Sequence, residues 1–254
     1  MASTYLTRTT GTSPTSRQKF TLSFWCKIDL TSANLDPFGI QIDGNTCLWL
    51  EVPNNGTKRL KFVDYYSGAE RSKLETNRLF RDPNAFFHIV LAADTTQTTA
   101  ADRLKLYING VQETSFASTT YPSQNSNFTN NVGTTTIGKN YDANYFSGII
   151  SHFHMTDGYV YDASAFGETD SLTGEWKIKV DPSVNYGNNG FFIFKNGTNL
   201  SGSTVQDQSG NSNNFTVGGG TLTKTEDNPS QVFASWNPLI PMNSTFSFAN
   251  ANTT

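Results

Sequence analysis

One stretch near the middle of the chain constrains the fold most, because it combines two different strand patterns with a tight turn. Apolar side chains occupy both faces of residues 86–93, which predicts a central strand covered above and below. Residues 103–108 alternate instead, so that strand is expected to be half buried. Asn109-Gly110 supplies the positive φ angles of a type I′ turn, which predicts that Val111 pairs with the last residue of the alternating strand. The stretch therefore favours a protein built from hairpins.

Further strands are expected at regular intervals along the chain. Residues 20–28 alternate cleanly, with Phe20, Leu22 and Phe24 on the face that we assign to the core. Turns rich in glycine, asparagine and proline separate the other candidates, and such spacing favours an all-β sandwich. The other expected strands are residues 38–42, 46–52, 60–65, 72–75, 134–138, 146–155 and 190–195.

The expected strands form one domain, residues 1–217, followed by a Pro-containing C-terminal arm or linker, residues 218–254. The polar residues 118–133 are expected to form a long surface loop. The arm carries sparse apolar anchors that would suit packing onto another subunit, namely Phe233, Trp236, Leu239, Ile240, Phe246 and Phe248.

Charge and hydropathy exclude some classes of partner. The net charge of −3 gives no basic surface to neutralise phosphates, so no nucleic acid partner is expected. The longest apolar run falls far short of the roughly 20 residues that span a bilayer, so no membrane insertion is expected. Cys26 and Cys47 each lie inside a candidate strand, which favours two buried thiols, with a single bridge between neighbouring strands as the alternative.

Several motifs resemble a known family. FTLSFWCK, FFHIV, KLYINGV and TIGKNYDANYFSG resemble, in order and spacing, the strands of laminin G-like domains, which are concanavalin A-like jelly rolls. This resemblance covers residues 19–155. The segments YLTRTTGTSPTSRQKFTLSFW, GIISHFHMTDGYVYDASAFGE, DQSGNSNNFTV and ASWNPL further resemble the laminin G-like virion proteins of marine bacteriophages. The resemblance implies a sandwich of two antiparallel sheets and a place on a virus particle.

The chain lacks the usual signatures of an enzyme. Jelly-roll glycanases carry a carboxylate pair on alternate positions of one strand, because the pair must flank the scissile bond. Glu51 and Asp64 stand alone and are interpreted as surface carboxylates at strand ends. No phosphate loop, H-E-x-x-H or G-x-S-x-G motif occurs. We therefore expect no catalytic residues.

His152 and His154 are candidate metal ligands, because alternate residues of a strand share a face. A third ligand would have to come from a distant residue such as His88, Asp142 or Asp157. The alternative, which we favour, is a packed or interfacial role, and the pattern FHxxDG in the phage relatives indicates a structural turn there.

Calcium is implied by the resemblance, since many laminin G-like domains hold one ion at the rim of the sandwich. No cofactor is certain, but calcium is a candidate, with oxygen ligands from Asp94, Asp142, Asp207 and Asn211. The alternative is that residues 207–214 form a turn whose short polar side chains bond to their own backbone.

Two tyrosine-rich segments are candidates for binding a glycan or a protein partner. One loop offers Asn140, Tyr141, Asp142, Asn144 and Tyr145, which combine ring faces with groups that bond to hydroxyls. The other candidates are Tyr65 and Tyr66. Exposed tyrosine suits protein interfaces equally well, so glycan site, protein contact and plain surface all stay open.

These observations favour a non-enzymatic bacteriophage virion structural protein: a capsid decoration, head fibre or tail-fibre component. Its adhesion-type surface would bind other virion proteins and a host surface glycan. We expect a homo-oligomer, with a trimer as one option, displayed on the particle surface after assembly in the host cytoplasm. The alternatives are a soluble carbohydrate-binding lectin and a glycan depolymerase.

Overall fold

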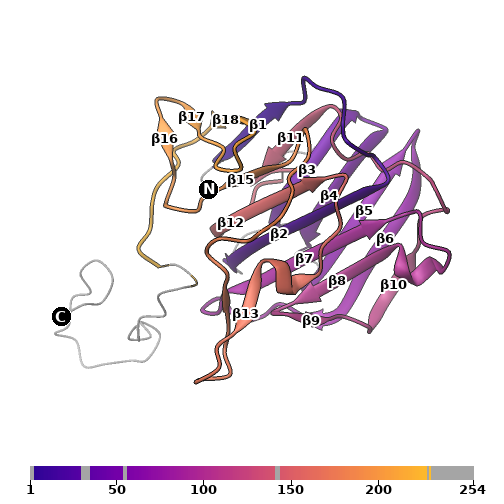
Figure 1. Cartoon of the computed structure of the whole chain (residues 1–254), viewed down its shortest axis with the longest axis horizontal. Helices are drawn as coiled ribbons and strands as arrows, with labels where there is room; N and C mark the ends of the chain where they lie inside the picture. The colour runs from indigo at the N-terminus through magenta and orange to yellow at the C-terminus, as the bar shows by residue number, and fades with distance from the viewer. Residues whose placement is uncertain (1–2, 30–34, 54–55, 141–143, 228, 230–254) are drawn as a thin grey trace.

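The computed structural model describes residues 3–29, 35–53, 56–140, 144–227 and 229, and these form a sandwich of two antiparallel sheets (Figure 1). Helix within these residues is limited to two single turns, η1 (Ala100–Asp102) and η2 (Ala163–Ala165). The predicted all-β class is therefore confirmed. No helix in the described ranges is long and apolar enough to cross a membrane.

The larger sheet has ten strands and includes the first and last strands of the described chain, side by side. In spatial order its strands are β10 (Phe116–Thr120), β6 (Ala69–Leu79), β5 (Arg59–Tyr66), β4 (Thr46–Val52), β3 (Leu35–Asp43), β11 (Thr134–Ile137), β1 (Tyr5–Thr9), β18 (Phe215–Gly219), β17 (Thr204–Val205) and β16 (Leu200–Ser201).

The smaller sheet has six strands and packs against the larger one. In spatial order its strands are β15 (Phe191–Ile193), β12 (Gly148–Asp157), β2 (Lys19–Ile28), β7 (Phe87–Asp94), β8 (Leu104–Ile108) and β9 (Val111–Gln112). A separate hairpin is formed by β13 (Gly167–Thr169) and β14 (Trp176–Ile178).

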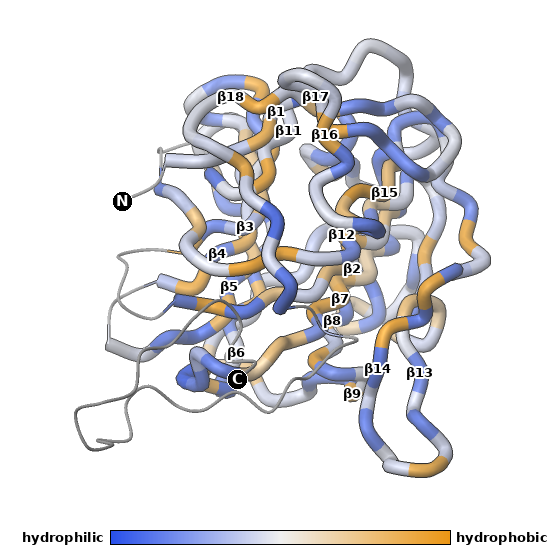
Figure 2. Tube along the Cα trace, turned by 90° about the vertical axis from the view of Figure 1, so that its left-hand side faces the viewer, coloured by the Kyte–Doolittle hydropathy of each residue, from blue (hydrophilic) through white to orange (hydrophobic). Residues whose placement is uncertain are grey.

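The main core lies between the two sheets, and strand alternation supplies it. Phe20, Leu22 and Phe24 of β2 are 0–1% exposed and belong to this core, as their alternation predicts. Strands of the larger sheet contribute residues such as Phe38 and Phe62 from the opposite side. Figure 2 shows hydrophobic residues recurring along the strands of the sandwich, with hydrophilic ones in the connections.

Strand β7 is covered on both faces, as its apolar pattern predicts. Ile89 and Leu91 face the main core, whereas Val90 belongs to a separate cluster with Ala163 and Phe166. That cluster is formed where residues 159–186, which we call the covering layer, pack on the outer face of the six-stranded sheet. The covering layer includes the β13–β14 hairpin, which projects from the body in Figures 1 and 2.

The predicted tight turn is also confirmed. Asn109 and Gly110 have φ angles of 49° and 81°, and Val111 pairs with Ile108. A Cβ added to Gly110 would lie 2.6 Å from Trp176 of the covering layer. Glycine is therefore required here both for the turn and for the close packing of an indole.

The long surface loop expected at residues 118–133 is wrong in two places. Its first residues belong to the edge strand β10, and residues 128–131 are buried. This buried connection bonds to distant groups, since the Thr129 N–H donates to Asp64 at 3.0 Å and Asn131 donates to Asp157 at 3.0 Å. Thr129 and Asn131 can be buried there because carboxylates on the two sheets accept their hydrogen bonds.

The two cysteines are buried thiols that are not joined by a disulfide, which confirms the prediction. Cys26 belongs to the main core, whereas Cys47 packs with Trp49 and Val63 on the other face of the ten-stranded sheet. The apolar anchors expected in the C-terminal arm, Phe233 to Phe248, lie outside the described residues.

Candidate functional site

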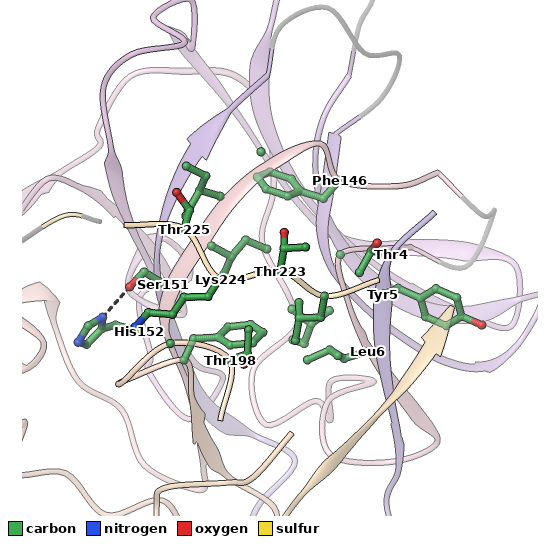
Figure 3. A pocket seen from close by; sticks show the side chains of 18 of the residues that line it. Thr4, Tyr5, Leu6, Phe146, Ser151, His152, Thr198, Thr223, Lys224 and Thr225 are labelled. Atoms are coloured by element: carbon green, nitrogen blue, oxygen red, sulfur yellow. Dashed lines mark hydrogen bonds between the residues drawn. The ribbon is translucent and has the colours of Figure 1, made fainter. Parts of the chain in front are cut away.

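A groove of about 630 Å³ opens where the two sheets meet near the start of β1 (Figure 3). Residues 4–6, 146–152, 194–198 and 221–225 contribute most of its lining. Buried Leu6 and Ile137 supply apolar surface, while threonine, serine, lysine and histidine side chains supply polar groups. A surface with both apolar and polar groups can contact both the apolar and the polar parts of a small molecule.

Residues 221–227 form one side of the groove and are fastened by polar contacts at both ends. The Thr4 hydroxyl donates to the Thr221 carbonyl at 3.1 Å, and Lys27 Nζ lies 2.6 Å from Asp227 Oδ2. The same Lys27 ammonium lies 5.6 Å from the ring centroid of Phe86. The groove is therefore built from segments that are far apart in the sequence.

A β-bulge in β12 forms another part of the lining. The pairing of β12 with β2 shifts register between Ser151 and His154, and His152 adopts a positive φ of 47°. Ser151 Oγ and His152 Nδ1 are 2.7 Å apart, and both residues line the groove (Figure 3). Burial lowers the pKa of His152 to about 4, so its imidazole is neutral at pH 7.

The two histidines of β12 do not form a metal site in the described part of the chain, where no three His, Cys, Asp or Glu side chains gather around one point. His154 is buried and hydrogen bonds Tyr186 at 2.8 Å, so the packed role favoured from the sequence is confirmed. The suggested third ligands are engaged elsewhere: His88 with Ser23 and Trp176, and Asp157 with backbone N–H groups. Asp142 lies outside the described residues.

A cluster of Tyr5, Lys139 and Tyr145, which we call the rim cluster, stands at one end of the groove. The rings of Tyr5 and Tyr145 are 6.0 Å apart, and Lys139 Nζ lies 4.5 Å and 5.9 Å from their respective centroids. Tyr5 also lines the groove, and its ring projects away from it in Figure 3. Tyr145, predicted as a binding residue, is thus placed next to the groove.

Of the other residues predicted to bind in this loop, the structure describes Asn140 and Asn144. Asn140 and Asn144 close the loop on itself, with Asn140 N–H donating to the Asn144 carbonyl at 3.1 Å and Asn144 N–H donating to Asn140 Oδ1 at 3.2 Å. Asn140 is 2% exposed, so its side chain supports the loop rather than presenting itself to solvent. Tyr141 and Asp142 lie outside the described residues.

The second predicted patch lies elsewhere on the ten-stranded sheet. The Tyr65 ring packs on Trp49 with 5.5 Å between centroids, and the Arg71 guanidinium lies 4.5 Å from the centroid of Tyr66. Neither tyrosine lines the groove. A binding role for this patch stays a prediction.

The two acidic residues considered for catalysis lie on opposite faces of the ten-stranded sheet. Asp64 pairs in register with the core residue Leu48, whereas Glu51 pairs with Lys61 on the other face, 2.8 Å from its ammonium. Their interpretation as surface carboxylates is wrong, because Asp64 is 1% exposed and Glu51 is 8% exposed. Burial raises the pKa of Asp64, although Arg71 lies 2.8 Å away and lowers it. Two carboxylates on opposite faces cannot flank one bond.

The predicted calcium ligands already bond to protein donors. Asp94 accepts from the neighbouring Thr96 and Gln97 and lies 3.4 Å from Lys19. Asp207 accepts N–H bonds from residues 192, 209 and 213 and a hydroxyl bond from residue 209. Asn211 donates to the carbonyls of residues 187 and 190. This geometry agrees with the alternative of a self-bonded turn at residues 207–214, and calcium binding stays a prediction.

The sequence reasoning missed most of the groove, including residues 4–6 and 221–225. One signal was available in the run Gly218-Gly219-Gly220. A Cβ added to Gly218 would lie 2.3 Å from the Tyr5 ring, and one added to Gly220 would lie 2.3 Å from the Thr4 hydroxyl. The glycine run therefore marks where the first strand packs closely against the last.

Comparison with known proteins gives one family and a set of similar folds. A family model described as the concanavalin A-like lectin/glucanases superfamily matches residues 2–165, more than half of the chain. A search of curated proteins finds no match.

Among solved structures, a Bacteroides ovatus protein described as carbohydrate binding is 18% identical, with a TM-score of 0.61. The match covers 91% of this chain and 60% of that protein, so this chain spans less than two thirds of its length. Domains LG4-5 of the mouse laminin alpha1 chain are 9% identical, with a TM-score of 0.42, over 75% of this chain and 44% of that one. The CBM40 domain of the Ruminococcus gnavus IT-sialidase is 15% identical, with a TM-score of 0.41, over 59% of this chain and 80% of that one.

Proposed function

Because the chain belongs to the concanavalin A-like lectin/glucanases superfamily, we propose that it is a non-enzymatic carbohydrate-binding protein whose ligand occupies the groove beside the rim cluster. The lectin-like sandwich provides the scaffold. The observation that carries the proposal is the groove itself, in which apolar and hydrogen-bonding groups lie side by side. A sugar ring presents the same combination, with C–H groups on its faces and hydroxyls on its edges.

The proposed setting is a bacteriophage particle, where the protein acts as a capsid decoration or as a fibre component. The support for this setting is the sequence resemblance of the opening segment and of DQSGNSNNFTV to laminin G-like virion proteins. Display of many copies would turn weak binding at each groove into firm attachment to a host surface. Labelling of virions with an antibody against this chain tests the setting, and particles without the label would contradict it.

A non-enzymatic role is supported by the placement of Glu51 and Asp64 on opposite faces of the sheet. The test is incubation of the purified protein with host capsular polysaccharide, followed by measurement of polysaccharide mass. We expect no change in mass. Release of oligosaccharides would favour the depolymerase alternative instead.

The site is tested by filling the groove. Thr223 lines the groove and is exposed, so Thr223→Trp would occupy the space of a ligand without disturbing the core. Thr173→Trp, at the exposed tip of the β13–β14 hairpin, is the matched control. On a glycan array we expect binding by the wild type and by the control, and loss of binding by Thr223→Trp. Equal binding by all three proteins would place the ligand elsewhere, and no binding by the wild type would refute the proposal.

A further inference from the structure

The rim cluster presents a cation rather than a bare aromatic face. The backbone of Gly218 and Gly219 packs closely against the Tyr5 ring, because added Cβ atoms would lie 2.3 Å and 3.0 Å from ring atoms. Lys139 Nζ lies over the same ring at 4.5 Å from its centroid and is also shared with Tyr145. Such an arrangement holds an ammonium group in place through cation–π attraction. A neutral sugar that stacked on the same face of Tyr5 would have to displace this ammonium group.

A second cation lies in the groove. Lys224 lines it, and the aliphatic part of this side chain packs over Gly197, where an added Cβ would lie 3.2 Å from Cδ and 3.3 Å from Cε. The absence of a side chain at Gly197 makes room for this contact. The lysine stem is therefore packed before any ligand arrives, which lowers the entropy lost on binding.

The acidic groups near the groove are already engaged. Asp227 pairs with Lys27 at 2.6 Å, and Asp29 accepts a hydrogen bond from the Ser147 hydroxyl at 2.8 Å. A third lysine of the lining, Lys195, pairs with Asp181. Across the described ranges, by contrast, Lys139 and Lys224 are in no ion pair.

We propose that the groove selects an acidic glycan, whose carboxylate or sulfate groups are bound by Lys224 in the groove and by Lys139 at the rim cluster. This inference rests on the proposed function and names the ligand class of the same site. The chain as a whole carries a net charge of −3, so one unpaired ammonium group in the groove and a second at the rim cluster are a local departure from its average. Unpaired ammonium groups attract anionic ligands, and lysine binds both carboxylate and sulfate as a point charge.

The experiment compares three classes of oligosaccharide by calorimetry on the full chain. The probes are alginate oligosaccharides, which carry carboxylates, sulfated carrageenan oligosaccharides, and neutral laminari-oligosaccharides of similar length. We expect tighter binding of at least one acidic class than of the neutral one, with affinity that falls as salt is raised. The two acidic probes distinguish the source of the anionic group. Poly-glutamate is a further probe, and binding of it as tight as that of the acidic sugars would mean attraction to any polyanion and would overturn the proposal.

The variants assign the effect to the two lysines. Lys139→Ala and Lys224→Ala are each expected to weaken acidic-glycan binding about tenfold, a change of about 1.4 kcal/mol. Lys179→Ala is the matched control, because Lys179 is a partly exposed lysine of the covering layer, outside the groove, that bonds to the Ser164 carbonyl. Circular dichroism of each variant establishes that it is folded. Lys224→Arg, which keeps the charge, is expected to retain most of the binding.

The outcomes separate this inference from the proposed function. If neutral and acidic glycans bind equally, and both lysine variants bind like the wild type, the acidic selectivity is wrong, while loss of binding by Thr223→Trp would still uphold the groove as a glycan site. If no glycan of either class binds, the proposed function fails together with this inference.

Discussion

Acidification from about pH 7.5 to about pH 5.5 is expected to weaken the fold strongly, because all three histidines are buried and neutral. His88 donates and accepts within the protein: its Nδ1 accepts from the Trp176 indole N–H at 3.0 Å, so its Nε2 carries the proton and donates to Ser23 Oγ at 2.9 Å. The ring also stacks on Trp25, with 4.7 Å between centroids. A second proton would break the bond from Trp176.

The size of this loss of unfolding free energy follows from the pKa values of the three histidines. Burial lowers the pKa of His88 to about 3 and that of His152 to about 4, and it lowers the pKa of His154 well below its ordinary value. In the unfolded chain each imidazole titrates near pH 6.5, so below that pH the unfolded state binds protons that the folded state does not. One pH unit below 6.5 costs about 1.4 kcal/mol per histidine, and about 4 kcal/mol for three. Domain stabilities are about 5–15 kcal/mol, so the loss is large.

The assay is urea unfolding at a series of pH values across this window. The slope of the unfolding free energy against pH gives the number of protons taken up on unfolding, which should approach about three at the acidic end. His152→Asn is a suitable variant, since His152 has a positive φ of 47° and asparagine tolerates that conformation. This variant should take up about two protons. The series stops near pH 5.5 because the raised pKa of Asp64 opposes the trend in stronger acid.

A free energy of unfolding that does not change with pH would refute this prediction. If the free energy of unfolding changes by less than about 1 kcal/mol between these two pH values, the folded protein must bind protons on its imidazoles as readily as the unfolded chain does. An unchanged proton uptake in His152→Asn would show in the same way that His152 is not one of the groups responsible.

Two further predictions concern stability at neutral pH. Gly110→Ala should lower the free energy of unfolding, measured in urea, by about 2–4 kcal/mol, because the new Cβ would lie 2.6 Å from Trp176 and the φ angle is 81°. The control is Gly44→Ala, which should change the free energy of unfolding little because the space around Gly44 is open. Asp157→Asn should cost about 2–4 kcal/mol, because its buried carboxylate accepts four N–H bonds. Asp181→Asn, at an exposed ion pair, should change the melting temperature little. If a variant and its control change stability equally, the structural reason given for that variant is wrong.

Strand patterns could be predicted from the sequence where burial follows a local period. The two-faced pattern of β7 and the Asn109-Gly110 turn were both confirmed, since a covered strand and a type I′ turn each depend on neighbouring residues. The buried connection 128–131 was missed because its polar residues resemble a loop. Its burial depends on Asp64 and Asp157, which lie far away in the sequence.

The candidate site was predictable only in part for the same reason. The rim residue Tyr145 lies in a local cluster of tyrosine and asparagine, which its composition reveals. The groove combines residues 4–6 with residues 194–198 and 221–225, and only the order of strands in the ten-stranded sheet brings them together. No local pattern in the sequence encodes that order.

The pairing of β1 with β18 sets the order of events during synthesis. Leu6 pairs with Val217, so more than two hundred residues must be synthesised after the first strand of the described chain before its second neighbouring strand exists. Until then β1 has only β11 beside it, and one edge of the larger sheet stays open. Contacts of such long sequence separation form late in folding. A nascent chain that lacks residues 221–225 would accordingly lack one side of the groove, so the groove is complete only after the last strand of the described chain has been made.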